Sequence, residues 1–356
     1  MTPFETMQLF NKVAPNRKDA YKNMQKNYLA GKVKLGLFSS SSVVIESDPN
    51  HIQKDHMLGL HEAGFIYNWH NEERAKRLAA RNLEFGTRLF GTWRNTASVY
   101  RIDESVAPQA VASVIPYETP SDIYVNLPEW CVYVEMPKCK KMTKYTYDYT
   151  DENNKDTNNG RDLEVLGFWA MHDHVNVNGR MMRCLDIFMH LKQDRDLQLK
   201  DMNLIPTRLL VSPDLTIMES LRIGYPDATD EELEDFPSRK ALSLLLWLCV
   251  EEPDVTNVTG QKMSRKALKE PRYARNKKTG TFVPPAQETY FDIAKRMGGD
   301  IRGYQKEIDD FEQGGRAAKR KAPHIRRGHW TGVWTGSGDN KTYKVYWQNP
   351  LFINAK

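Results

Sequence analysis

Two apolar runs on either side of Asn178-Gly179 constrain the fold more than any other feature of the sequence. Together they span residues 163–191 and are rich in aliphatic, aromatic and β-branched side chains. An Asn-Gly pair readily adopts the positive φ angles of a tight hairpin turn. The sequence therefore predicts an antiparallel β-hairpin in the middle of the chain.

Helical patterns dominate before this hairpin. Pro3 suits the first turn of a helix, and apolar residues recur with helical spacing between residues 53 and 90. Residues 119–137 instead combine β-branched and aromatic residues around Pro128, which predicts two short strands joined by a bend. Farther along, Thr229 and Glu232 have the spacing of a helix capping box, and the apolar run 242–250 predicts a buried helix.

These patterns predict an α+β fold with a helical N-terminal part, a mixed and mainly antiparallel β centre, and a basic C-terminal β-hairpin. We divide the chain into a mainly helical region 1–105, an α+β core 106–312 and a Trp-rich hairpin region 313–356. The three regions are compatible with one compact unit.

Several protein classes are excluded by the sequence. The longest strongly apolar run, Leu242–Val250, is about half the length needed to cross a bilayer, and the first residues do not have the pattern of a secretion signal. The four cysteines, at positions 131, 139, 184 and 249, form no Cys-x-x-Cys pair. We therefore expect reduced thiols, a cytoplasmic location, no membrane contact and no cofactor.

His172, Asp173 and His174 form the sharpest metal-like cluster. On a strand, however, the two histidines point to one face and Asp173 to the other, so a metal site would need another ligand from elsewhere. A structural strand is the expected role of these residues. We assign no metal site and no catalytic residue, and expect that the chain is not an enzyme.

The C-terminal segment interleaves cations with aromatic rings. Residues 314–356 contain nine Lys or Arg against one acid, a net charge of +8 within a total of +5. Such a surface can contact phosphates and stack on bases of single-stranded RNA. A structural hairpin with a charged edge and a surface for an acidic protein are the alternatives. The candidate RNA- or ribosome-binding residues are Arg326, Arg327, His329, Trp330, Trp334 and Trp347.

A second candidate surface lies in residues 91–104. Trp93 and Arg94 are residue types enriched at the energetic centres of protein interfaces. Burial of Trp93, with Arg94 bound to nearby carbonyls, is the alternative. The peptide- or protein-binding candidates are Trp93, Arg94, Asn95, Trp130 and Tyr133.

An ordered set of motifs resembles the second family of type V-A anti-CRISPR proteins, which phages and plasmids carry. The set includes GTWRNTASVYRIDE (91–104), TPSDIYVNLPEWCVYVE (119–135), LLWLCVEEPDVT (245–256) and PHIRRGHWTGVWTG (323–336). The shared order of these motifs is more specific than any one of them.

The resemblance implies a regulator that acts during translation in the bacterial host cytoplasm. Members of the family bind the N-terminal segment of the nascent type V-A CRISPR effector nuclease and trigger loss of its messenger RNA. The implied partners are that nascent peptide and, through the basic tail, the ribosome or the messenger RNA. A ribonuclease that cleaves the message directly and an RNA- or DNA-binding repressor that uses the tail are the alternatives.

Overall fold

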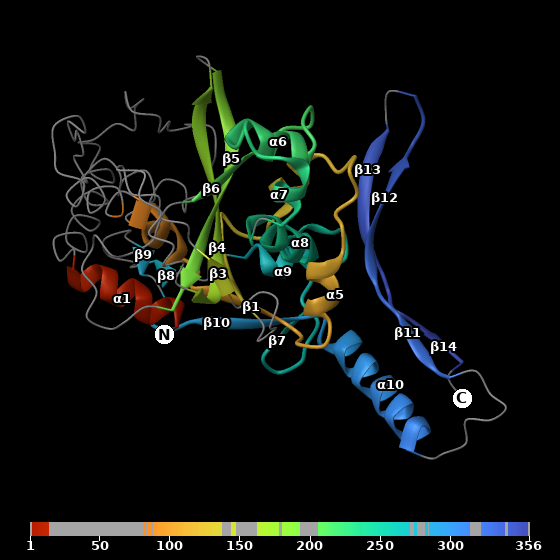
Figure 1. The fold of residues 1–356 in the computed structure, drawn as a ribbon. Helices are drawn as coiled ribbons and strands as arrows, with labels where there is room; N and C mark the ends of the chain where they lie inside the picture. Colours follow the sequence, from red (N-terminus) through yellow and green to blue (C-terminus); the bar gives the residue numbers. More distant parts are fainter. Residues whose placement is uncertain are drawn as a thin grey trace, which may run out of the picture.

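A computed structural model describes the chain over residues 2–13, 82, 85–86, 88–136, 144–146, 162–177, 180–192, 206–235, 237–270, 274–275, 282–283, 285–313, 322–338 and 341–354. Helices and strands in these ranges confirm the predicted α+β class (Figure 1). The helices are α1 (Pro3–Val13), α5 (Ala107–Ala112), the 3₁₀ helix η1 (Ser121–Asn126), α6 (Ile217–Gly224), α7 (Asp230–Asp235), α8 (Pro237–Cys249), α9 (Arg265–Leu268) and α10 (Lys295–Gln313).

A mixed β-sheet forms the centre of the molecule. Its strand order is β6-β5-β4-β2-β1-β10-β7, with β3 paired to β4. The predicted hairpin is confirmed, because β4 and β5 pair in antiparallel fashion and Val177 lies opposite Arg180 across Asn178-Gly179. The strands are β1 (Ser98–Ile102), β2 (Cys131–Glu135), β3 (Lys144–Thr146), β4 (Asp162–Val177), β5 (Arg180–Leu191), β6 (Thr207–Leu210), β7 (Val255–Asn257) and β10 (Thr289–Ile293).

Three neighbouring strands of this sheet are parallel. β1 pairs with β2 on one side and with β10 on the other, both in parallel register, whereas β4 and β7 flank the three in antiparallel register. Parallel strands need a crossover connection, which α5 and η1 supply between β1 and β2. The carboxyl ends of β1, β2 and β10 therefore meet at one edge of the sheet.

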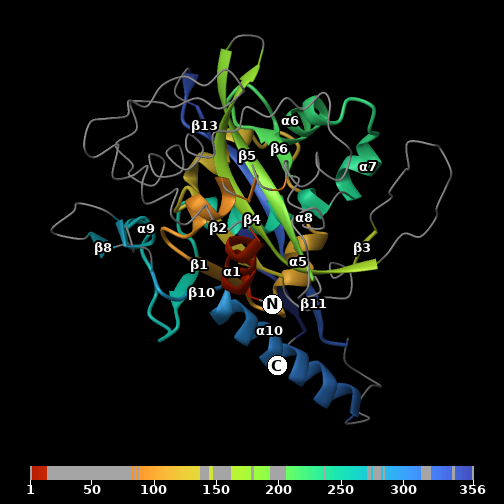
Figure 2. The same ribbon diagram turned by 90° about the vertical axis from the view of Figure 1, so that its left-hand side faces the viewer.

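The two faces of the sheet bury different hydrophobic clusters. Along β1, Tyr100 and Ile102 join the larger cluster and Val99 the smaller one, as the two-residue period of a strand requires. The larger cluster lies beneath α8, where the predicted apolar helix is buried from Leu242 to Cys249. Figure 2 shows α1 in front of the opposite face, over the smaller cluster.

α1 is attached to the sheet by aromatic and polar contacts. The rings of Phe10 and Phe90 are 5.1 Å apart. The Thr6 hydroxyl lies 2.8 Å from Nε2 of His190, and the Tyr133 hydroxyl lies 2.8 Å from Nδ1 of the same ring. Burial lowers the pKa of His190 to about 3, so the imidazole is neutral at physiological pH.

The C-terminal hairpin is also confirmed and forms a long ribbon beside α5 and α8 (Figure 1). β12 and β13 pair over seven residues, and β11 with β14 extends the ribbon. Its Trp330 is buried 5.3 Å from the Trp247 ring of α8, and Trp330 Nε1 donates to Ser243 Oγ at 3.0 Å. The remaining strands are β8 (Ala274–Arg275), β9 (Phe282–Val283), β11 (His324–Arg326), β12 (His329–Thr335), β13 (Thr342–Gln348) and β14 (Leu351–Ile353).

One predicted strand is wrong. Residues 121–126 form the 3₁₀ helix η1, and only the second expected strand, β2, is present. The aromatic content of this segment serves packing: Tyr124 is fully buried, and its hydroxyl donates to the Leu242 carbonyl at 3.1 Å. The predicted capping box is confirmed, because the backbone N–H of Thr229 donates to the Glu232 carboxylate and that of Glu232 to the Thr229 hydroxyl.

The expected division at residue 105 runs through the central sheet, since β1 precedes it and β2 and β10 follow it. α1 confirms the helix predicted from residue 3 as far as Val13. The predicted helical segments between residues 14 and 81 lie outside the described residues. Within the described ranges, no helix is long and apolar enough to span a lipid bilayer.

We expect the core of α8 to dominate stability. Leu245 is fully buried, so Leu245→Ala should lower the free energy of unfolding by about 2–5 kcal/mol. Ile223 is 53% exposed, and Ile223→Ala should change the free energy of unfolding by no more than about 0.5 kcal/mol. Urea denaturation followed by circular dichroism measures both values, and equal losses would contradict this assignment of the core.

Stability should also fall in mild acid. The pKa of His190 is about 3 in the folded chain and about 6.5 when unfolded, so the unfolded chain binds more protons between these pH values and is favoured as pH falls. His190→Gln should therefore reduce the loss of unfolding free energy between pH 7 and pH 5. His329 is exposed, so His329→Gln is the control that removes a histidine without removing a buried one. Identical pH profiles for His190→Gln and the parent chain would refute this role.

Candidate functional site

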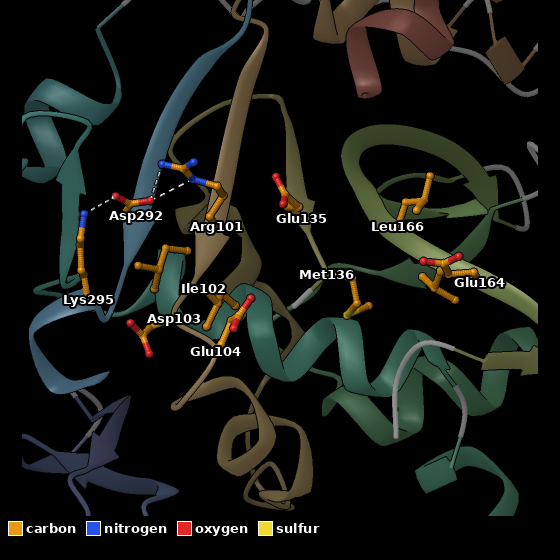
Figure 3. A pocket seen from close by; sticks show the side chains of 12 residues that line it. Arg101, Ile102, Asp103, Glu104, Glu135, Met136, Glu164, Leu166, Asp292 and Lys295 are labelled. Carbon is orange, nitrogen blue, oxygen red and sulfur yellow. Dashed lines mark hydrogen bonds and ion pairs between the residues drawn. The ribbon is translucent and has the colours of Figure 1, made fainter. Parts of the chain in front are cut away.

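A pocket of about 520 Å³ opens where β1, β2 and β10 end (Figure 3). Ligands of sheets with parallel strands commonly bind at the carboxyl ends of those strands, because the last strand residues and the following loops converge there. Residues from four strands and from the first turn of α10 line this pocket: Arg101, Ile102, Asp103, Glu104, Glu135, Met136, Glu164, Val165, Leu166, Asp292, Ile293 and Lys295.

Arg302 and Lys192 pair with two carboxylates of the pocket, Asp103 and Glu164, from outside its lining. Five carboxylates and two cations line the pocket itself. Both cations contact one acid: Asp292 accepts a hydrogen bond from Arg101 Nε at 2.9 Å and one from Lys295 Nζ at 3.1 Å. Glu104 and Glu135 are exposed at the pocket. Five carboxylates against these four cations leave a surplus of one acidic group, which favours a cationic ligand over an anionic one.

The chemistry of the lining is that of a binding surface. Ile102, Met136 and Leu166 contribute apolar surface beside the carboxylates. A Lys or Arg side chain matches this combination, because its alkyl part can contact apolar groups while its charged end meets a carboxylate. None of the twelve lining residues carries a hydroxyl, thiol or imidazole group. Among the described residues, no three His, Cys, Asp or Glu are grouped to hold a metal ion.

The structure places the His172–Asp173–His174 cluster inside the molecule. All three side chains on β4 are at most 9% exposed. Burial, with a smaller contribution from the Arg183 charge, lowers the pKa of His172 to about 3. Asp173 forms an ion pair with the buried Arg88. These contacts account for the cluster as part of the folded core.

Trp93, Arg94 and Asn95 fix the turn that precedes β1. Trp93 is fully buried, and its Nε1 donates to the Ser98 carbonyl at 3.0 Å. Arg94 Nε and Asn95 Nδ2 both donate to the Gly91 carbonyl, at 3.3 and 3.1 Å. This is the structural alternative considered for the segment, in which Arg94 binds nearby carbonyls.

The other two peptide-binding candidates are buried as well, Trp130 at 5% and Tyr133 at 1% exposure. Trp130 packs against the His174 ring at 5.9 Å, and Tyr133 against Trp169 at 4.9 Å. Of the five candidates, only Arg94 is partly exposed. Peptide contact in this part of the molecule stays a prediction, and it now rests on Arg94.

The hairpin candidates separate into two groups. Trp330 and Trp347 pack on α8 and on each other, with ring centres 5.1 Å apart. Trp334 is 55% exposed, although its Nε1 donates to Glu118. Arg326, Arg327 and His329 are exposed, and the last two line a pocket of about 560 Å³ between α5 and β12. RNA or ribosome contact stays a prediction for these four exposed residues.

The acidic pocket was not predicted from the sequence. Four of its five acids lie at or just beyond the ends of the short strands β1, β2 and β10, and β10, which contributes Asp292, was not recognised as a strand. The alternation in residues 289–293 was the available signal. Their parallel pairing with β1, which places Ser98 opposite Thr289, has no local mark in a single sequence.

Comparisons with known proteins give one consistent result. The sequence model of the AcrVA2-like, anti-CRISPR type V subtype A2 family matches residues 100–355. Among solved structures, the chain is similar to one titled "Crystal structure of AcrVA2", with a TM-score of 0.67 and 31% sequence identity over 99% of this chain and 98% of that one. No curated protein sequence matches the chain. Every residue that lines the acidic pocket falls within the family match.

Removal of negative charge from the pocket should weaken binding of a cation. We expect the double substitution Glu104→Gln and Glu135→Gln to reduce affinity for a short Lys- and Arg-rich peptide by about threefold to tenfold at low salt, with a smaller effect at high salt. The double substitution Glu231→Gln and Glu312→Gln, at exposed positions of α7 and α10, is the control for net charge. Fluorescence anisotropy measures the affinities, and equal binding by both variants would exclude this pocket.

Proposed function

The chain belongs to the anti-CRISPR type V subtype A2 family, and we propose that it binds the N-terminal segment of a nascent type V-A CRISPR effector nuclease and triggers loss of the effector's messenger RNA. The observation that carries the proposal is the likeness to the AcrVA2 structure, which extends over 99% of this chain at 31% identity. In this proposal the chain acts in the host cytoplasm during translation.

The acidic pocket supports the peptide-binding part of the proposal. Its exposed Glu104 and Glu135 can receive a basic side chain, and Met136 lies beside them for an alkyl contact. Short-range charge pairing of this kind selects among peptides more than it adds to affinity. The pocket would thus favour a peptide with a basic residue in a suitable position.

The C-terminal ribbon supports the part of the proposal that places the chain near RNA. Arg326, Arg327 and His329 are exposed at its base, and Trp334 offers an exposed ring farther along. Cations beside aromatic rings can contact phosphates and bases without a sequence requirement. In the proposal these residues favour a position near the translating ribosome, while the peptide determines which message is affected.

We propose that the chain has no catalytic centre of its own. A ribonuclease would need accessible groups for proton transfer or metal binding. Among the described residues, the strongest such cluster is His172–Asp173–His174, which is buried in the sheet. Recruitment of a host nuclease is the mechanism consistent with this burial.

The proposal predicts that messenger loss follows the encoded peptide. The chain should be co-expressed with a type V-A effector gene that has its native start region, and with one whose first codons specify a different peptide at a similar translation rate. Loss of the effector message, measured by quantitative reverse-transcription PCR, should be confined to the native peptide. Equal loss from both genes would contradict peptide recognition and favour an RNA-directed activity.

A message with a disabled start codon is the control for the repressor alternative. A repressor that uses Arg326 and Arg327 would act on this untranslated message as well, because it needs only RNA or DNA contact. The proposed function predicts no loss from the untranslated message.

A further inference from the structure

β13 has a free edge. It pairs with β12 in a two-stranded sheet, and no third strand of the described chain continues that sheet. The free edge faces a groove of about 930 Å³ between the ribbon and the C-terminal end of α8. The groove includes most of β13, from Thr342 to Trp347, on one side and residues 249–252 on the other.

The hydrogen bonds of the ribbon show which backbone groups point into this groove. The backbone N–H of Trp330 donates to Ser113 Oγ rather than to β13. In an antiparallel pair, such a residue and its partner both direct their N–H and C=O groups away from each other's strand. Trp330 pairs with Trp347 and the register is continuous, so the same holds for the pairs at Val345 and Tyr343.

The outward N–H and C=O groups of Tyr343, Val345 and Trp347 therefore form a row of alternating donors and acceptors along the groove. No hydrogen bond within the described part of the chain uses them. This row has the spacing of another β-strand, because outward groups recur every second residue.

Side chains in the groove point to the same kind of ligand. The indole rings of Trp247 and Trp347 are among its lining residues. Ile123 and Met297 add apolar surface to the lining, where alternate side chains of an extended peptide could be buried.

We propose that this groove binds an extended peptide, which adds to the edge of β13 as a third, short strand. An added strand supplies the backbone acceptors and donors that Tyr343, Val345 and Trp347 present, and alternate apolar side chains face Ile123 and Met297. The identity of the occupant rests on the proposed function: it is the N-terminal segment of the effector.

The charges of the groove do not favour nucleic acid as its ligand. Lys344 is paired with Glu251 at 2.8 Å and Arg296 with Asp254 at 2.8 Å, so two of its cations are already compensated. The groove and the acidic pocket lie on either side of the first turn of α10, where Lys295 lines the pocket and Arg296 the groove. A single peptide can therefore pair its backbone with β13 in the groove and place a basic side chain in the acidic pocket.

Alternate N-methylation of the peptide tests strand addition without any change in the protein. The probe is a synthetic peptide with the first twenty or so residues of a type V-A effector, and its affinity for the full chain is measured by calorimetry. Methyl groups on every second backbone nitrogen should weaken binding at least tenfold in one register, where they face β13. In the other register they face solvent and should leave affinity within about threefold.

A matched pair of protein variants tests whether the peptide binds at the edge of β13. Val345→Pro removes an outward N–H without removing a bond to β12, whereas Val345→Ala keeps that N–H and also reduces the buried side chain. With folding confirmed by near-ultraviolet circular dichroism, only Val345→Pro should lower the affinity for the peptide at least tenfold. If Val345→Pro does not fold, the methylated peptides alone test strand addition, because they need no change in the protein.

The outcomes separate this inference from the proposed function. If the unmodified peptide does not bind the parent chain, the proposed recognition step is wrong, and so is the occupant assigned to the groove. If it binds but both methylation registers are equivalent, only strand addition at β13 is overturned. A concentration-dependent dimer, seen by sedimentation and abolished by Val345→Pro alone, would assign the edge to a second copy of the chain instead.

Discussion

The parallel alignment of β1 between β2 and β10 organises the central sheet and the pocket at its end. It pairs residues 98–102 with residues 289–293, almost two hundred positions away, and brings three carboxyl ends to one edge. The acidic pocket forms at that edge, and α10 begins beside it. The groove along β13 lies beyond the same helix turn. The acidic pocket thus follows from this strand arrangement, and the groove adjoins it at the first turn of α10.

This sheet is covered on both faces, which fixes its register and requires its buried polar groups to be satisfied. A shift of one residue would exchange the two hydrophobic clusters. Asp186 shows how a buried charge is tolerated: it is fully buried and accepts two hydrogen bonds of 2.7 Å from Arg208. His190 is kept neutral instead, with both ring nitrogens in hydrogen-bond contact. The interior therefore offers little accessible reactive chemistry, and the surface carries the proposed function.

Sequence reasoning succeeded where a pattern is local. The Asn178-Gly179 hairpin, the apolar helix before Cys249 and the Thr229 capping box each occupy adjacent residues, and each is present. It failed where a structure depends on remote pairing. η1 was taken for a strand because its composition resembles one, and the pocket was missed because parallel pairing has no local signature. Residue type also did not reveal exposure, so Trp93 and Trp130 became interface candidates although both are buried.

We propose that the chain recognises a peptide as it leaves the ribosome. Purified ribosomes stalled on the effector message at increasing lengths, with the native or the recoded start peptide, test it directly when the chain is added and co-sedimentation is measured. We expect binding only to native complexes, and only after the N-terminal segment has emerged. Equal binding to recoded complexes, or to complexes in which the segment is still enclosed, would contradict it and assign recognition to the ribosome or the RNA.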